Sequence, residues 1–90
     1  MPSLRVPAML KYYLDDQTEI RLEGRTVGEV LRELAGKYPK IESHLFDPKG
    51  KVRRHINIFV NAENVRDLQG LGTAVGENDV VKILPSVTGG

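Results

Sequence analysis

The residues with the clearest chemical potential are the last two, Gly89 and Gly90. Glycine has no side chain, so a Gly-Gly end can enter a narrow channel and leaves its α-carboxylate unhindered. This carboxylate is anionic at neutral pH and is a weak nucleophile. It can attack the α-phosphate of ATP to form an acyl-adenylate, which a sulfur donor can then open. The alternative is a glycine-rich terminus with no chemical role, which is common in proteins.

The short segment behind the glycine pair determines how far the carboxylate can reach. Six residues from Pro85 to Gly90 span at most ~20–22 Å when extended, enough to deliver the carboxylate beyond the surface of a small domain. We therefore predict a folded domain over residues 1–85 and a flexible C-terminal tail over residues 86–90.

A basic cluster, Lys49, Lys51, Arg53 and Arg54 beside His55, is the next candidate. A nucleic-acid site would need interleaved aromatic residues and a basic total charge, whereas the formal net charge is +1. A solvated turn with basic flanks is the favoured interpretation, and contact with an acidic surface of a partner protein stays open. We expect no nucleic-acid partner.

Other patterns indicate neither catalysis nor a cofactor. His44 and His55 lack neighbouring ligands at metal-binding spacing, and Gly70-Leu71-Gly72 lacks the lysine of a phosphate-binding loop. No serine, histidine and carboxylate constellation suggests an enzyme. The absence of cysteine excludes disulfides, thiolate metal sites and a cysteine nucleophile. We expect no metal and no bound cofactor.

Length and composition fit one ordinary domain. Ninety residues with 40% hydrophobic and 28% charged content can form one modest core. We find no signal peptide and no apolar run of membrane-spanning length, so we expect a soluble cytoplasmic protein without a membrane partner.

The hydrophobic pattern predicts an α+β fold. Thr26 begins a capping-box sequence, and Val27, Val30, Leu31 and Leu34 continue it with the spacing of one apolar helix face, which Pro39 ends. Period-two patterns predict strands, one of them very short, over residues 4–10, 18–22, 56–60, 65–66 and 80–84. One main helix can therefore cover a mixed four- to five-stranded sheet.

The C-terminal pattern Asp79-x-Val81-x-Ile83-x-Pro85-x-x-x-Gly89-Gly90 resembles that of ubiquitin-like sulfur carriers of the MoaD/ThiS family. The resemblance covers nearly the whole chain. Residues 46–48, 51–61, 63–66 and 72–75 resemble the CysO-like branch of cysteine biosynthesis, and the segment 43–55 is longer than in the shortest family members.

The resemblance implies a β-grasp fold, in which the first and last strands pair centrally. It also implies a carrier rather than an enzyme: a ubiquitin-activating-like adenylyltransferase/sulfurtransferase uses ATP and Mg to adenylate Gly90, and sulfur then converts Gly90 to a thiocarboxylate. A sulfur-accepting synthase receives the sulfur, and a metalloprotease of the JAMM type releases the product. Three alternatives stay open: a protein modifier joined to lysines, a carrier for molybdopterin or thiamine thiazole, and a binding module without terminal chemistry.

The partner would need an apolar surface near the tail. Phe59 is opposite in phase to its apolar neighbours in the strand 56–60, and Leu84 and Val87 flank the tail. We predict that Phe59, Leu84 and Val87 contact the activating enzyme together with Thr88, Gly89 and Gly90. The alternative is that Phe59 and Leu84 belong to the buried core.

Overall fold

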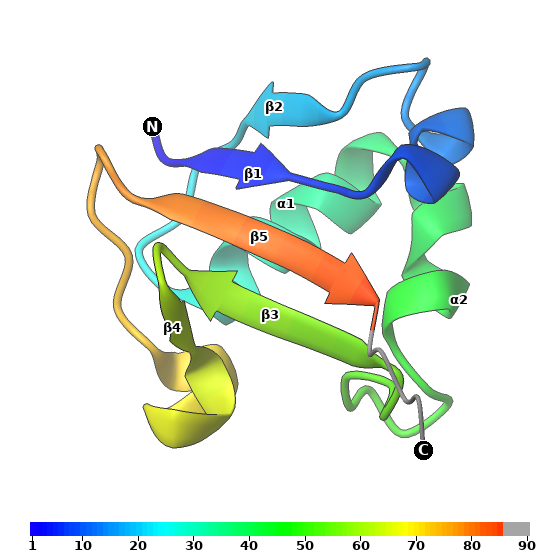
Figure 1. The fold of residues 1–90 in the computed structure, drawn as a ribbon. Coiled ribbons are helices and arrows are strands. Elements are labelled where there is room, and N and C mark those ends of the chain that lie inside the picture. The colour runs from blue at the N-terminus through cyan, green and yellow to red at the C-terminus, as the bar shows by residue number, and fades with distance from the viewer. Residues whose placement is uncertain (86–90) are drawn as a thin grey trace.

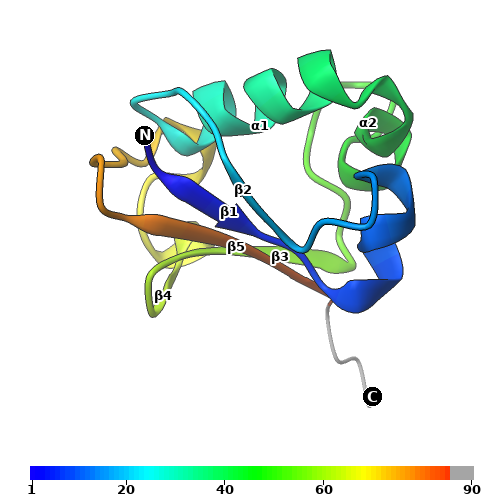
Figure 2. The same ribbon diagram turned by 90° about the horizontal axis from the view of Figure 1, so that it is seen from above.

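The computed structural model describes residues 1–85 as a helical layer packed on one face of a curved β-sheet (Figures 1 and 2). Residues 86–90, including the site residues Val87, Thr88, Gly89 and Gly90, lie outside the described residues. The elements of the two layers are the strands β1 (Ser3–Arg5), β2 (Glu19–Arg21), β3 (Ile56–Val60), β4 (Glu63–Asn64) and β5 (Val80–Pro85) and the helices α1 (Val27–Lys37) and α2 (Glu42–Leu45).

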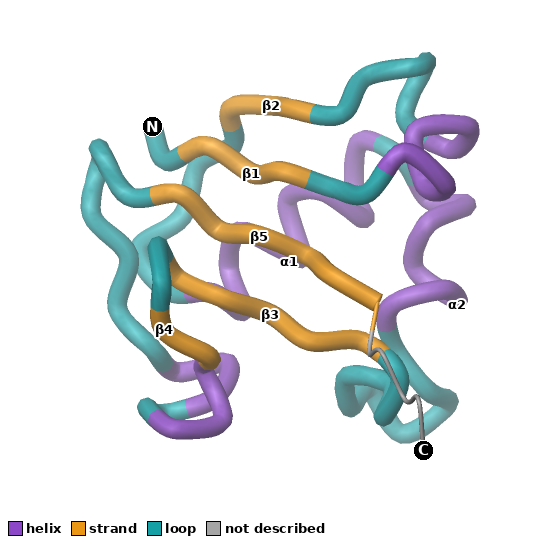
Figure 3. The backbone as a smooth tube through the Cα atoms, viewed as in Figure 1, coloured by secondary structure: helices purple, strands orange, loops and turns teal. Residues whose placement is uncertain are grey.

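The sheet is mixed, and its strand order is β2-β1-β5-β3-β4. The first and last strands, β1 and β5, are neighbours in the centre, and β3 lies along the other side of β5 (Figure 3). β1 and β5 are parallel, with Leu4 beside Val81, while β3 runs antiparallel to β5. This confirms the predicted mixed sheet and its central pairing. The pairing brings together segments more than 70 residues apart, which no local pattern reveals.

Helix α1 forms where the capping signal predicts it. Thr26 has extended backbone angles, and its hydroxyl oxygen accepts a hydrogen bond from the Glu29 N–H at 3.2 Å. The Glu29 carboxylate accepts from the N–H of Arg25 at 3.0 Å, one residue earlier than a standard capping box uses. Both bonds hold the loop against the first helical turn.

The core lies between α1 and the sheet. From the helix, Val27, Val30, Leu31 and Leu34 are fully buried, as their spacing predicts. They pack with a cluster that includes Leu4, Leu14, Leu22, Ile41, Leu45, Ile58, Val81 and Ile83.

Two predicted strand boundaries are wrong. The first strand ends at Arg5, and residues Ala8–Tyr13 form a 3₁₀ helix. Pro7 precedes this helix and has no N–H for a strand ladder; the turn, rather than a strand, buries Leu10. The short strand lies at Glu63–Asn64 instead of 65–66, because the Asn64 side chain accepts the Arg66 N–H at 2.9 Å and starts a 3₁₀ turn there.

Among residues 1–85, no helix is long and apolar enough to cross a membrane.

Candidate functional site

The candidate site is the end of the sheet at which β5 leaves the domain. Strand β5 is paired with β3 over its last five residues, so that Ile83 lies opposite Ile58 and Pro85 opposite Ile56. Its first three residues also pair with β1. The strand that leads to the C-terminal segment is therefore the central strand of the sheet, and its end is fixed beside the start of β3.

The face of the sheet turned away from α1 carries the two predicted contact residues that the structure describes. Phe59 lies opposite Lys82, and Leu84, two residues further along β5, lies opposite Asn57. Because side chains alternate along a strand, these four share one face. Phe59 is half-buried and Leu84 is 41% exposed.

The alternative that Phe59 and Leu84 belong to the core is therefore wrong, since neither is part of the buried cluster. Leu84 lies near the end of β5, and Phe59 lies further back on the same face, opposite Lys82, so both are available to a partner. That they contact one stays a prediction, as does any role for Val87 and Thr88.

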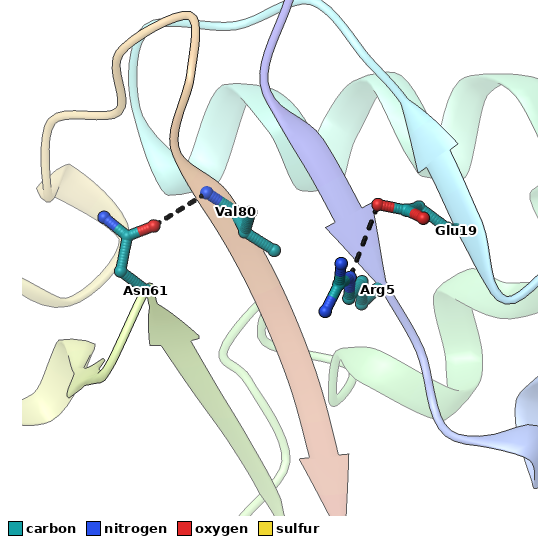
Figure 4. A network of polar contacts seen from close by, with 4 residues as sticks. All are labelled: Arg5, Glu19, Asn61 and Val80. Atoms are coloured by element: carbon teal, nitrogen blue, oxygen red, sulfur yellow. Dashed lines mark hydrogen bonds and ion pairs between the residues drawn. The ribbon is translucent and has the colours of Figure 1, made fainter.

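A polar network holds the opposite end of β5, where the strand begins. Asn61 adopts a left-handed conformation, with φ of 56°. Its side-chain oxygen accepts the Val80 N–H at 3.0 Å (Figure 4), and its side-chain amide donates to Asp79 at 3.0 Å. The other Asp79 carboxylate oxygen accepts the Gly76 N–H at 2.8 Å. The hydrogen bond from Asn61, and to a smaller extent that from Gly76, holds the pKa of Asp79 below its ordinary value. Burial acts in the opposite direction.

The face of the sheet turned away from α1 also carries an ion pair, between β1 and the edge strand β2. Arg5 on β1 donates from Nε to the Glu19 carboxylate on β2 at 3.3 Å (Figure 4). Both side chains are more than half exposed, so the pair contributes little to stability. Its effect is to neutralise two charges beside the central strands.

The basic cluster lies beside the end of β5, a position the sequence did not predict. Segment 47–55 leads directly into Ile56, the residue opposite Pro85. Within it Asp47 holds the turn, because its Oδ1 accepts the N–H groups of both Lys49 and Lys51 at 2.9 Å. This segment lies next to the end of β5 because of the register between β3 and β5, which the sequence pattern does not reveal.

The two histidines have separate environments. The ring of His44 stacks on Tyr13 with centroids 4.2 Å apart, while His55 is exposed in the basic segment. Over residues 1–85, no group of three or more histidine, cysteine or carboxylate side chains is arranged to hold a metal ion.

These features define the class of the protein. A mixed five-stranded sheet with a parallel central pair, crossed by one main helix, is the β-grasp fold of ubiquitin-like proteins. The ThiS family matches residues 4–90, and the chain belongs to that family.

Similar proteins agree with this assignment. The sulfur carrier protein CysO of Mycobacterium tuberculosis is 39% identical over 90 residues, which cover 98% of this chain and 97% of the relative. A chain in the crystal structure of the Amycolatopsis orientalis BexX/CysO complex matches with a TM-score of 0.90 and 30% identity, over 100% of both chains. The small archaeal modifier protein 1 of Methanosarcina acetivorans has a TM-score of 0.83 and 34% identity, covering 98% of this chain and 94% of that one. The family and the first relative support a sulfur carrier role.

Proposed function

We propose that this protein carries sulfur as a thiocarboxylate on Gly90 and donates it in the biosynthesis of cysteine or a related sulfur-containing metabolite. It is a protein co-substrate rather than an enzyme, and it is regenerated by each new loading. The supporting observation is the placement of β5: the central strand leads to the rim of the domain, with Gly89 and Gly90 four and five residues beyond its end.

The loading chemistry has two steps, both performed by an activating enzyme of the ubiquitin-activating type. A Gly90 carboxylate oxygen attacks the α-phosphorus of ATP, the bond from that phosphorus to the bridging oxygen breaks, and pyrophosphate leaves. A hydrosulfide or other sulfur donor then attacks the Gly90 carbonyl carbon, and the C–O bond to AMP breaks. The ATP and Mg belong to the activating enzyme, so this chain needs no bound cofactor of its own.

The domain contributes positioning. A strand held by hydrogen bonds to β1 and β3 gives the terminal segment a fixed point of departure, which limits the conformations lost when the segment enters an active site. Leu84 lies beside this point and Phe59 lies further back on the same face; both supply apolar area for the activating enzyme, with Val87 and Thr88 continuing the contact.

The remaining partners follow from the CysO-like resemblance. They are a synthase that accepts the sulfur and a metalloprotease of the JAMM type that releases the product. Because loading consumes ATP, the proposed location is the cytoplasm.

A second function uses the same first step. Gly90 adenylate can end as an isopeptide bond to a lysine of another protein, and the similarity to a small archaeal modifier protein favours keeping this candidate. Conjugates of increased mass on denaturing gels would indicate the modifier, whereas a free thiocarboxylate indicates the carrier.

The test is intact-mass spectrometry after incubation with the activating enzyme, ATP, Mg and sulfide. The carrier is expected to gain the mass difference between sulfur and oxygen, and a chain lacking Gly90 is expected to gain none. An unchanged mass, with an activating enzyme that loads another carrier under the same conditions, would refute the proposed function.

A further inference from the structure

A second surface, distinct from the open face of the sheet, adjoins the end of β5. It is a cleft of about 240 Å³ whose walls are mainly the apolar side chains of Val52, Ile56, Ile58, Val65 and Leu71. This volume is below the ~300–1,000 Å³ of typical small-molecule sites, so the cleft suits one inserted side chain better than a cofactor. Because Ile56 is also the cross-strand neighbour of Pro85, the wall of the cleft at Ile56 lies next to the point where the chain leaves the domain.

Two cations, Lys51 and Arg66, also line this cleft. The guanidinium of Arg66 donates to the carbonyl oxygens of Arg54 and Ile56 and to the side-chain oxygen of Asn57, at 3.2–3.3 Å. All three acceptors are neutral, so they fix the position of Arg66 without cancelling its charge. Lys51 is held through its main chain by the turn at Asp47, which leaves its ammonium group exposed.

No carboxylate forms an ion pair with the cations of this basic surface within the described part of the chain. The ion pairs found among residues 1–85 are Arg5–Glu19 and Lys37–Glu33, and neither includes a cation of segment 47–55. That segment holds four cations and one anion, whereas the rest of the chain holds nine cations and eleven anions. The net charge of segment 47–55 is therefore +3, and that of the rest of the chain is −2.

The negative charge includes groups at the far end of the sheet. Glu63 lies on β4 opposite Val60, and Glu77 and Asp79 precede the start of β5. Arg21 and Arg25 lie at this end too and partly offset the anions, whereas the four cations of segment 47–55, at the end where the chain leaves the domain, face one anion within the segment. A negatively charged surface therefore attracts the end of the domain that carries segment 47–55, and steering of this kind raises association rates by roughly 10- to 1,000-fold.

We infer that the cleft and its basic rim dock an acidic segment of the activating enzyme, with one bulky aliphatic side chain of that segment inserted between Val52, Val65 and Leu71. That the partner is the activating enzyme rests on the proposed function, whereas the inference that this surface binds an acidic segment is independent of it. Charge complementarity selects an acidic occupant, because Lys51 and Arg66 flank an otherwise apolar cleft. The docking orients the carrier so that its C-terminal segment faces the active site.

The first experiment measures adenylation of full-length carrier variants by pyrophosphate release. Lys51→Glu is expected to lower kcat/KM about three- to tenfold with kcat unchanged, and the defect is expected to shrink at high salt. Arg25→Glu makes the same charge change at the far end of the sheet and is expected to leave kcat/KM within twofold. Equal kcat/KM for the two variants, with normal loading of the wild type, would overturn the inference and leave the proposed function standing.

The second experiment needs no activating enzyme. The ¹⁵N-labelled chain is titrated with a short peptide of aspartates and glutamates around one leucine, and with the same peptide carrying serine in place of leucine. The leucine peptide is expected to shift the amide signals of Val52, Ile58, Val65 and Leu71 and to bind several-fold more tightly. Equal binding of both peptides, shifts confined to Phe59 and Lys82, or competition by a single-stranded oligonucleotide at equal charge concentration would overturn the assignment.

Discussion

Replacing Asn61 by alanine tests how the start of the central strand is held. The side chain of Asn61 joins β3 to β5 through two hydrogen bonds, to the Val80 N–H and to the Asp79 carboxylate, both at 3.0 Å. Its backbone is left-handed, with φ of 56°, a conformation that costs alanine more free energy than it costs asparagine. Asn61→Ala therefore removes two bonds and introduces backbone strain at one position.

The expected loss of unfolding free energy is about 2–3 kcal/mol at neutral pH. Each exposed hydrogen bond contributes ~0.5–1 kcal/mol, and the left-handed conformation costs alanine ~1 kcal/mol more than it costs asparagine or glycine. Asn61→Gly is the matched control, because it loses the same two bonds without the strain. It is expected to cost about 1–2 kcal/mol, so that the difference between the variants isolates the backbone.

The effect of Asn61→Ala is also expected to depend on pH. The Asn61 amide is the largest cause of the lowered pKa of Asp79. A carboxyl group with a lowered folded-state pKa contributes stability that is complete above its unfolded pKa of about 3.9 and is lost as the pH falls through the folded value. The variant lacks most of this contribution, so its deficit relative to wild type is expected to be larger at neutral pH than in strong acid.

The assay is urea denaturation followed by circular dichroism, at neutral pH and well below the folded-state pKa of Asp79. A deficit below ~0.5 kcal/mol at neutral pH, where two bonds and strain predict more, would refute the structural argument. A deficit that is equal at both pH values would show that Asp79 is not held by Asn61.

Three further predictions concern the helix and the exit of β5. Gly24→Ala is expected to lower the unfolding free energy by more than ~1 kcal/mol in thermal denaturation, because φ is +150° and an added Cβ would lie 2.8 Å from Val30. The control Gly36→Ala, whose added Cβ would have no atom within 4 Å, is expected to be neutral or stabilising. Thr26→Ala is expected to lose ~1 kcal/mol by the same measurement and Thr26→Ser much less, since only alanine removes the capping oxygen. Leu84→Ser is expected to raise the KM for adenylation with little change in melting temperature, because the side chain is exposed and outside the core; a fall in melting temperature with unchanged KM would contradict this.

Local signals in the sequence predict the helix well and the strand ends poorly. The capping residue and apolar spacing of α1 are both local, and the structure confirms them. Leu10 fits a period-two strand equally well, yet a 3₁₀ turn buries it, because Pro7 interrupts the ladder two residues after β1 ends. Periodicity does not distinguish these two ways of burying one leucine.

The site divides in the same way. The alternation along β3 indicates that Phe59 points to the face of the sheet opposite to its buried neighbours, and the structure confirms this. The sequence alone does not show whether Phe59 contacts a partner or belongs to the core. The placement of the basic segment beside the exit of β5 depends on the pairing of Ile56 with Pro85. That contact between distant segments is set by the register of the sheet, which no single element encodes.

The parallel pairing of β1 and β5 also determines how the domain bears mechanical load. Ser3 lies beside Val80, so β1 begins at one end of the pair and β5 leaves at the other. A pull on the chain before Ser3 and after Pro85 draws the two strands past each other, which strains their hydrogen bonds together rather than one after another. The β1–β5 pair is therefore loaded in shear when force acts between these two points, the geometry in which a ladder of hydrogen bonds resists most.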